Sequence, residues 1–212
     1  MTNTARDEIL ERLRAQERDK PMPVAWRSRR HFADVITRFQ EALSAVGGEP
    51  IHVADLTTAV AKLREVLLDM GATTAIVNPD PPLDRVRFAQ VLPGLNWSIV
   101  GQGDLDVRTI AAVADVGISS GTAGLAETGS VIVESGAQHS RLAILLPPVH
   151  IVLLPTSRIT VDLFTWVAER QQPLPSSLTI ITGPSKTADI EQTLATGVHG
   201  PGRFIVILFD DE

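Results

Sequence analysis

The segment 181–191 combines residue types that can hold an anion. Its apolar start predicts a strand, and the Gly-Pro pair, hydroxyl groups and lysine that follow predict a turn into a short helix over 187–194. Backbone amides of the turn and the positive end of the helix would stabilise a phosphate or a carboxylate. The candidate ligand-binding residues here are Gly183, Ser185, Lys186, Thr187 and Asp189. Strand–turn–helix units are common, so a capped connection without a ligand is an equally good interpretation.

Residues 197–203 follow closely and contain three glycines, a histidine and an arginine. Glycine allows a backbone to approach a ligand closely. His199 could transfer a proton or donate to an anion, and Arg203 could clamp an anion. The alternative is a turn into the last strand with a surface histidine.

The segment 126–130 precedes a predicted strand and places a carboxylate and hydroxyl groups beside backbone amides. Glu127 could position or deprotonate a ligand hydroxyl, and Thr128 and Gly129 could contact the same ligand. The alternative is a tight turn with a solvated glutamate. We predict that this turn meets the one near residue 186 and that together they enclose a small carboxylate or phosphate. Glu127 and His199 would then be the catalytic groups.

Residues 117–121 match the G-x-S-x-G pattern of a hydrolase nucleophile. Such a serine must lead into a substantial helix, and the next predicted strand follows too soon, so a hydrolase is disfavoured. His150 lies in an apolar run and is predicted to be a core or edge residue. The other histidines show no metal-binding spacing, so no metal site is expected.

The composition of the 212 residues limits the chemistry further. The chain has no cysteine, which excludes disulfides, thiolate zinc sites, a cysteine nucleophile and a thiolate-bound iron–sulfur cluster on this chain. Its net charge of −6 and few aromatic residues disfavour nucleic-acid binding. No apolar run approaches the ~20 residues of a membrane span, and the first residues lack the apolar core of a signal peptide. We therefore expect a cytoplasmic protein.

The hydrophobic pattern predicts an α/β protein with two regions. Residues 1–47 are predicted to form a helical N-terminal extension, whose second helix is capped by Ser28. Residues 48–212 alternate short apolar runs with amphipathic stretches, which predicts a mixed, mostly parallel sheet with helices on both faces. Within this region we expect a helix at 83–91 and a strand at 141–146. Because open α/β sheets bind ligands at the carboxyl ends of their strands, we expect the cleft there.

Three blocks of the sequence together resemble a known family. They are 126–131 (AETGSV), 145–151 (LLPPVHI) and 182–191 (TGPSKTADIE), the last followed by 197–201 (GVHGP). In this order and spacing they are similar to the LUD domain of the LutC/YkgG family of lactate-utilization proteins. The resemblance covers most of the chain and is strongest from Asp115 to the end.

The resemblance implies a fold similar to the NagB/RpiA/CoA-transferase group. It also implies a role in oxidising L-lactate to pyruvate within a three-component iron–sulfur system. Cysteine-rich partner proteins would carry the clusters, and no cofactor is expected on this chain. Two alternatives stay open: an independent enzyme acting on a sugar phosphate or CoA ester, and a non-catalytic assembly subunit.

Overall fold

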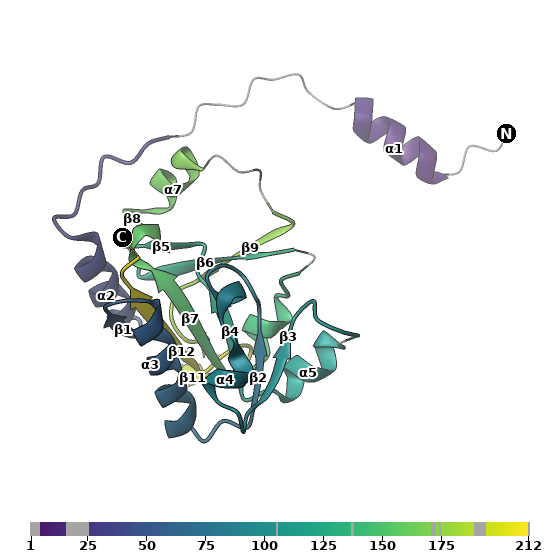
Figure 1. Ribbon diagram of the computed structural model, residues 1–212. Coiled ribbons are helices and arrows are strands. Elements are labelled where there is room, and N and C mark those ends of the chain that lie inside the picture. Colours follow the sequence, from purple (N-terminus) through teal and green to yellow (C-terminus); the bar gives the residue numbers. More distant parts are fainter. Residues whose placement is uncertain are drawn as a thin grey trace.

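The computed structural model describes residues 5–15, 26–104, 106–136, 138–170, 173, 175–188 and 194–211. Its centre is a six-stranded sheet in the order β1-β12-β7-β4-β2-β3, and all neighbouring strands run parallel (Figure 1). The strands are β1 (Glu49–Val53), β2 (Thr74–Val77), β3 (Asn96–Ile99), β4 (Val116–Ser120), β7 (Val149–Pro155) and β12 (Arg203–Phe209). The predicted α/β class with a mostly parallel sheet is confirmed.

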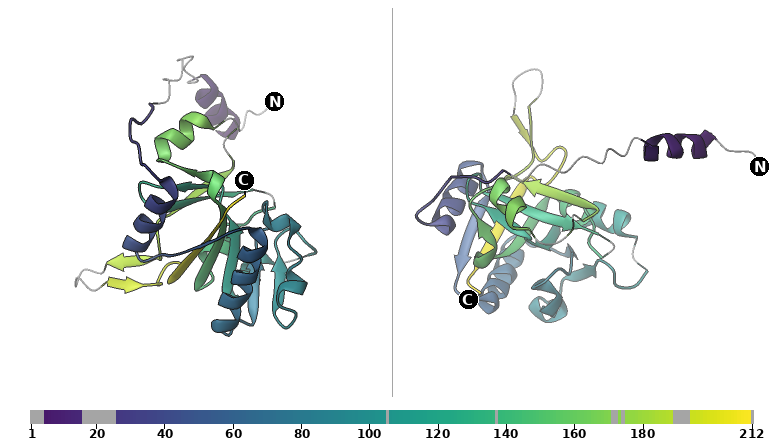
Figure 2. Two further views of the ribbon diagram at one scale, coloured as in Figure 1. Left: turned by 60° about the vertical axis from the view of Figure 1, so that its left-hand side comes forward. Right: turned by 90° about the horizontal axis from the view of Figure 1, so that it is seen from above.

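The antiparallel pairing of the chain lies outside the central sheet. A second sheet has four strands in the order β8-β5-β6-β9, in which β6 runs antiparallel to both of its neighbours. Its strands are β5 (Ala123–Leu125), β6 (Ser130–Ser135), β8 (Ile159–Thr160) and β9 (Ser177–Ile181). A further antiparallel hairpin, formed by β10 (Lys186–Ala188) and β11 (Leu194–Thr196), projects from the body (Figure 2).

With the exception of the first helix, the helices lie on both sides of the central sheet. The α-helices of the described residues are α1 (Ala5–Ala15), α2 (Val35–Ala45), α3 (Leu56–Asp69), α4 (Phe88–Val91), α5 (Val107–Val113), α6 (Leu142–Leu145) and α7 (Leu163–Glu169), and two 3-10 turns lie at Leu83–Arg85 (η1) and Thr156–Arg158 (η2). None of the residues of helix α1 is buried, and it stands apart from the α/β body in Figure 1 and in the right-hand view of Figure 2. Among the described helices, none has the length and apolar character needed to cross a membrane.

The two faces of the central sheet pack against different layers, because successive side chains of a strand point to opposite faces. Ala75 and Val77 of β2 join a core cluster with α3 and α4. Ile76, between them, packs with α5 and α6 instead. On this second face the cluster built by α2 and strand β6 also packs against β7 and β12. The prediction of helices on both faces is therefore confirmed, and the second sheet adds to the cover of one face.

Helix α2 belongs to the core of the body. Asp34 caps it by accepting hydrogen bonds from the amides of Ile36 and Thr37 at 2.9 and 3.2 Å. Phe39 and Leu43 of this helix are completely buried. The predicted cap at Ser28 is wrong, because the helix begins only at Val35.

Three further element predictions are wrong. The expected helix at 83–91 is two short pieces, η1 and α4, separated by a residue with extended backbone at Val86. The expected strand at 141–146 is helix α6, since a short apolar run does not distinguish a buried strand from a buried helix. The expected helix at 187–194 is contradicted at both ends, because Thr187 lies in strand β10 and Leu194 begins β11.

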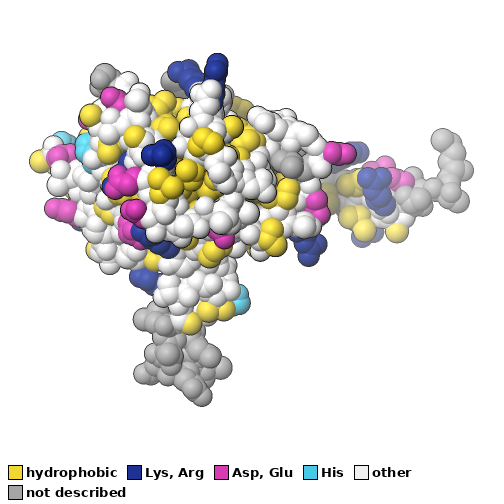
Figure 3. Space-filling model, turned by 60° about the horizontal axis from the view of Figure 1, so that its bottom comes forward, with side chains coloured by type: hydrophobic (Ala, Val, Ile, Leu, Met, Phe, Trp, Pro, Cys, Tyr) yellow, Lys and Arg dark blue, Asp and Glu magenta, His cyan; other side chains and the backbone are white. Residues whose placement is uncertain are grey.

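The surface carries charges of both signs. On the face shown in Figure 3, acidic and basic side chains are interspersed with hydrophobic ones. This mixture accords with the modest net charge of −6 over 212 residues.

Candidate functional site

The two turns singled out by the sequence do meet. Strand β6 pairs with β9, which brings the turn before β6 next to the turn after β9. A chain of hydroxyl groups joins them: Thr128 Oγ1 lies 2.7 Å from Ser130 Oγ, which lies 2.7 Å from Thr182 Oγ1. The predicted proximity of these turns is a feature of the structure.

The charged groups of this region, however, already have protein partners. Glu127 forms an ion pair with Arg30 of the segment before α2. Lys186 Nζ donates to the carbonyl of Val46 at 2.6 Å. Arg203 binds the Glu49 carboxylate through Nε and Nη2, at 2.6 and 2.7 Å. These three side chains therefore do not converge on one anion cradle, and their ligand-binding role stays a prediction.

The two glycines of these turns make room for α2 and the residues that follow it. A Cβ on Gly129 would lie well under 3.0 Å from the backbone of Leu43, and a Cβ on Gly183 would press on Val46. Both glycines also have positive φ, at 66° and 80°. Their close approach serves a helix contact, at least in part, rather than a ligand.

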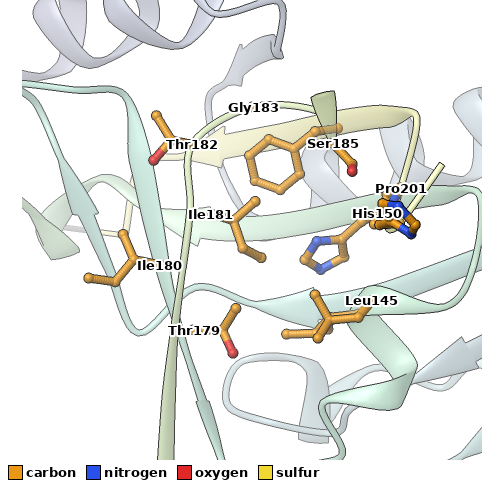
Figure 4. A pocket seen from close by; sticks show the side chains of 13 residues that line it. Leu145, His150, Thr179, Ile180, Ile181, Thr182, Gly183, Ser185 and Pro201 are labelled. Atoms are coloured by element: carbon orange, nitrogen blue, oxygen red, sulfur yellow. The ribbon is translucent and has the colours of Figure 1, made fainter. Parts of the chain in front are cut away.

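The remaining predicted residues are divided between a pocket and the hairpin. Thr187 pairs with Ala195 across β10 and β11. His199 and Ser185, with Gly183, line a pocket of about 220 Å³ under the turn that follows β9 (Figure 4). Asp189 lies outside the described residues.

This pocket lies at the amino-terminal edge of the central sheet. His150 and Phe204, which line it, are the second residues of β7 and β12. The expectation that the predicted cleft sits at the carboxyl ends of the central strands is therefore wrong. The positive end of a helix does not face this pocket from Thr187, because the described residues there, Lys186–Ala188, form strand β10.

His150 is the buried group of this pocket. Its Nε2 lies 2.9 Å from Ser119 Oγ, and its Nδ1 has no hydrogen-bond partner among the described residues. Burial lowers the pKa of His150 to about 3, so the ring is neutral. Ser119 itself is buried within strand β4 rather than exposed on a turn, which removes the nucleophile-elbow interpretation of 117–121.

The carboxyl ends of the central strands carry a second, polar cavity. Asp80 follows β2, Thr122 follows β4 and Arg158 follows β7. Together with side chains from β6 and α7 they line a groove of about 820 Å³. The other lining residues are Pro81, Glu134, Trp166, Glu169 and Arg170. This edge is the place where open parallel sheets bind ligands; we call the cavity the carboxyl-edge groove.

Asp80 in this groove is paired with a histidine behind it. Its Oδ1 lies 2.7 Å from Nε2 of His139, and its side chain is 20% exposed. Burial raises the pKa of Asp80 to about 6, against the attraction of His139. Asn78 fixes the loop that carries His139, because its side chain exchanges hydrogen bonds with the backbone of Ser140 at 3.1 and 3.0 Å. A carboxylate with a pKa near neutrality is suited to accept a proton.

Arg158 supplies the positive charge of the groove. Its Nη1 donates to the carbonyl of Gly121 at 2.8 Å, to that of Pro81 at 3.2 Å and to Ser120 Oγ at 3.3 Å. Among the described residues, no acceptor is bonded to its Nε or Nη2. The guanidinium is therefore held in place by one nitrogen while others remain able to bind a carboxylate.

The opposite wall of the groove is an ion pair stacked on an aromatic ring. Arg170 Nη1 lies 2.6 Å from Glu134 Oε1, and the guanidinium lies 4.9 Å from the centroid of the Trp166 ring. This contact ties α7 to β6. Within the described residues no three His, Asp or Glu side chains are grouped closely enough to hold a metal ion.

Sequence reasoning missed Asp80, His139 and Arg158. A signal did exist, since Asp80 and Arg158 both come within a few residues of the ends of predicted strands, where sheet ligands bind. The local spacing around His139 indicates no metal site. Its partner, Asp80, lies 59 positions earlier in the chain, so a local motif does not reveal the pair.

The fold and the groove define an α/β protein whose parallel sheet presents a polar cavity at its carboxyl edge. A sequence model of the LUD domain matches residues 36–209, and the chain belongs to that family. It is 39% identical over 174 residues to lactate utilization protein C of Halalkalibacterium halodurans, covering 76% of this chain and 75% of that protein. It is 30% identical over 193 residues to lactate utilization protein C of Bacillus subtilis, covering 84% and 79%. The resemblance stated from the three sequence blocks is confirmed.

A solved structure supports the fold alone. The crystal structure of a DUF162 family protein from Deinococcus radiodurans aligns with a TM-score of 0.54 and 19% identity, over 82% of this chain and 96% of that one.

Proposed function

We propose that this chain is a cytoplasmic subunit of a lactate-utilization system that oxidises L-lactate to pyruvate with iron–sulfur partner proteins. Membership of the LUD family and the names of its relatives support the lactate part of the proposal. The chain has no cysteine, so a thiolate-bound cluster does not fit on it and would belong to a partner.

We further propose that lactate binds in the carboxyl-edge groove. The observation that carries this choice is that Asp80, which is paired with His139, lines the same cavity as Arg158. A 2-hydroxy acid needs a cation for its carboxylate and a base for its hydroxyl group, and the groove offers both. The turns around Glu127 and Lys186 offer the same residue types, but these are engaged with Arg30 and Val46.

In this proposal Arg158, Asp80 and His139 each have one task. The free nitrogens of Arg158 bind the carboxylate, and Asp80 accepts the hydroxyl proton, with His139 stabilising the Asp80 carboxylate until then. Oxidation to pyruvate removes two electrons and two protons from lactate. The O–H bond releases the proton that Asp80 accepts, and the Cα–H bond releases the second proton; in this proposal that proton and both electrons go to the iron–sulfur partner proteins, which are the oxidant.

The experiment co-purifies the chain with whichever proteins its genomic neighbours encode, selects those that are rich in cysteine, and follows lactate-dependent reduction of a dye by the assembled complex. Asp80→Asn is expected to lower turnover by about 10²–10⁴-fold, as expected for loss of a general base. Arg158→Gln is expected to weaken lactate binding by about 10- to 100-fold, the value of a hydrogen bond to a charged group. Arg64→Gln, an exposed arginine of α3, is the matched control and is expected to change neither.

The outcomes separate the alternatives. If both groove variants retain full activity in an assembled complex, lactate is not oxidised in this groove. If lactate fails to bind while a sugar phosphate or a CoA ester raises the melting temperature, the chain is an independent enzyme. The size of the groove favours this second candidate, because about 820 Å³ would hold a ligand well above the size of lactate. Fractionation of cells tests the cytoplasmic location.

A further inference from the structure

We propose that the pocket beneath the turn after β9 is a second binding site, for a small uncharged compound with an apolar body and a carbonyl group that accepts a hydrogen bond from His150. This pocket has no lining residue in common with the carboxyl-edge groove. It lies at the opposite edge of the central sheet, so the proposal stands apart from the lactate proposal.

The walls of the pocket are mainly apolar. Figure 4 shows Ile181 and Leu145 beside the imidazole of His150, whereas the side chain of Ile180 points to the other side of β9. The other apolar side chains of the lining are Ile144, Pro201 and Phe204. The volume of about 220 Å³ lies below the usual range for drug-sized ligands, so the occupant is a single ring or a short chain.

The lining carries no group that would compensate a charged ligand. None of the lining residues is an aspartate, glutamate, lysine or arginine, and its titratable members are His150 and His199. Burial of an ion against such walls would remove its hydration without a counter-charge. The pocket therefore favours an uncharged compound.

His150 provides the specific contact at the inner end. The residue is completely buried, its ring packs against Phe204 at a centroid distance of 5.4 Å, and Nδ1 has no partner among the described residues. A buried polar atom without a partner is rare in native proteins and needs an explanation. A ligand that reaches Nδ1 supplies one.

Ser119 decides whether Nδ1 is a donor or an acceptor. In the described part of the chain, Ser119 Oγ has no hydrogen-bond partner other than His150 Nε2. The serine hydroxyl satisfies its own hydrogen by donating to Nε2, which leaves the ring proton on Nδ1. The pocket then presents a fixed N–H donor, and its complement is an acceptor such as a carbonyl oxygen.

An opening to solvent is present at the apolar rim. Leu145, which lines the pocket, is 38% exposed. This side chain would be covered by the apolar body of the ligand as its carbonyl reaches His150.

The test uses three probes of one shape with the full-length protein: acetophenone, benzoate and ethylbenzene. The protein is labelled with ¹⁵N-histidine, and NMR follows the His150 ring nitrogens during each titration. We expect the spectrum of the free protein to show the Nδ1–H form. We expect acetophenone to bind and shift Nδ1, ethylbenzene to bind about five- to tenfold more weakly, and benzoate to bind more weakly than acetophenone.

His150→Phe keeps an aromatic ring and removes the donor, so the preference for acetophenone over ethylbenzene should disappear while ethylbenzene still binds. His31→Phe, an exposed histidine, is the control and should leave all affinities unchanged. Ser119→Ala is a second variant that should weaken acetophenone binding by releasing the ring proton. No shift of Nδ1 with acetophenone would mean that water alone occupies this position, and equal affinity for benzoate would remove the argument from charge. Either result overturns the proposal whether or not lactate binds in the groove.

Discussion

The clearest physical consequence of the groove concerns the stability of the protein against pH, and Asp80→Asn tests it. The Asp80 carboxyl has an ordinary pKa of 3.8 when the chain is unfolded and about 6 in the folded protein, because burial disfavours its charged form. Because folding raises this pKa, the Asp80 carboxyl makes its full contribution to the free energy of unfolding below pH 3.8. That stability is lost as the pH rises through 6.

The size of the effect follows from the shift. A difference of about 2.2 pKa units corresponds to an upper bound of about 3 kcal/mol at pH 7 and above. The carboxyl keeps 20% of its exposure, so we expect a realised value of about 1–2 kcal/mol. At pH 4 the same relation gives a difference of about 0.5 kcal/mol or less, because the folded carboxyl is protonated and the unfolded one is only a little more than half ionised.

The assay is urea unfolding of Asp80→Asn and of the parent protein at pH 4 and at pH 7.5. The asparagine variant is expected to be more stable than the parent at pH 7.5, by about 1–2 kcal/mol, and nearly equal to it at pH 4. Asp104→Asn, an exposed aspartate that is not among the charges acting on Asp80, is the matched control for the loss of one carboxylate. If Asp80→Asn destabilises the protein at pH 7.5, the carboxylate is favourably paired rather than poised for proton uptake. The groove would then lose its base.

Two other substitutions test contacts that position the site. Gly129→Ala should lower the free energy of unfolding, measured by denaturant titration, by about 1–3 kcal/mol more than Gly71→Ala does. Both glycines have positive φ, but only Gly129 faces the backbone of Leu43. Equal losses would mean that α2 does not press on this turn. Asp115→Asn should lower the free energy of unfolding by about 1 kcal/mol at pH 7 and by nothing measurable near pH 2. Four hydrogen bonds from Thr73 and Thr74 lower the pKa of Asp115 to about 2, and their contribution is lost as the pH falls through that value. A loss of stability that is independent of pH would contradict this reasoning.

The sequence alone was sufficient for the α/β class and for the mostly parallel character of the sheet. Runs such as 149–154 and 204–209 are apolar throughout, which is typical of parallel strands buried on both faces. The same rule failed at 141–146, because four apolar residues fit one turn of a buried helix as well as a short strand. At 187–194 the expected helix was contradicted because Thr187 pairs with Ala195, a contact that local propensity does not contain.

For the site, the sequence indicated which residue types could act, but it did not indicate which side chains are paired with each other. The sequence showed which side chains could carry charge or a proton, including Glu127, Lys186 and Arg203. It did not show that these three are bound to Arg30, Val46 and Glu49, since those partners are 97, 140 and 154 positions away.

The sequence by itself determined the α/β class, the family and the lack of any thiolate that could hold a cluster on this chain, because each of these depends on composition or on order along the chain. Only the tertiary structure decided which polar groups stand alone and which are already paired. Asp80 meets His139 because Asn78, which follows β2, binds the backbone of the loop after β6. His150 is neutral, and its Nδ1 has no partner among the described residues, because strand pairing buries it beside Ser119, and burial is a property of the packed molecule.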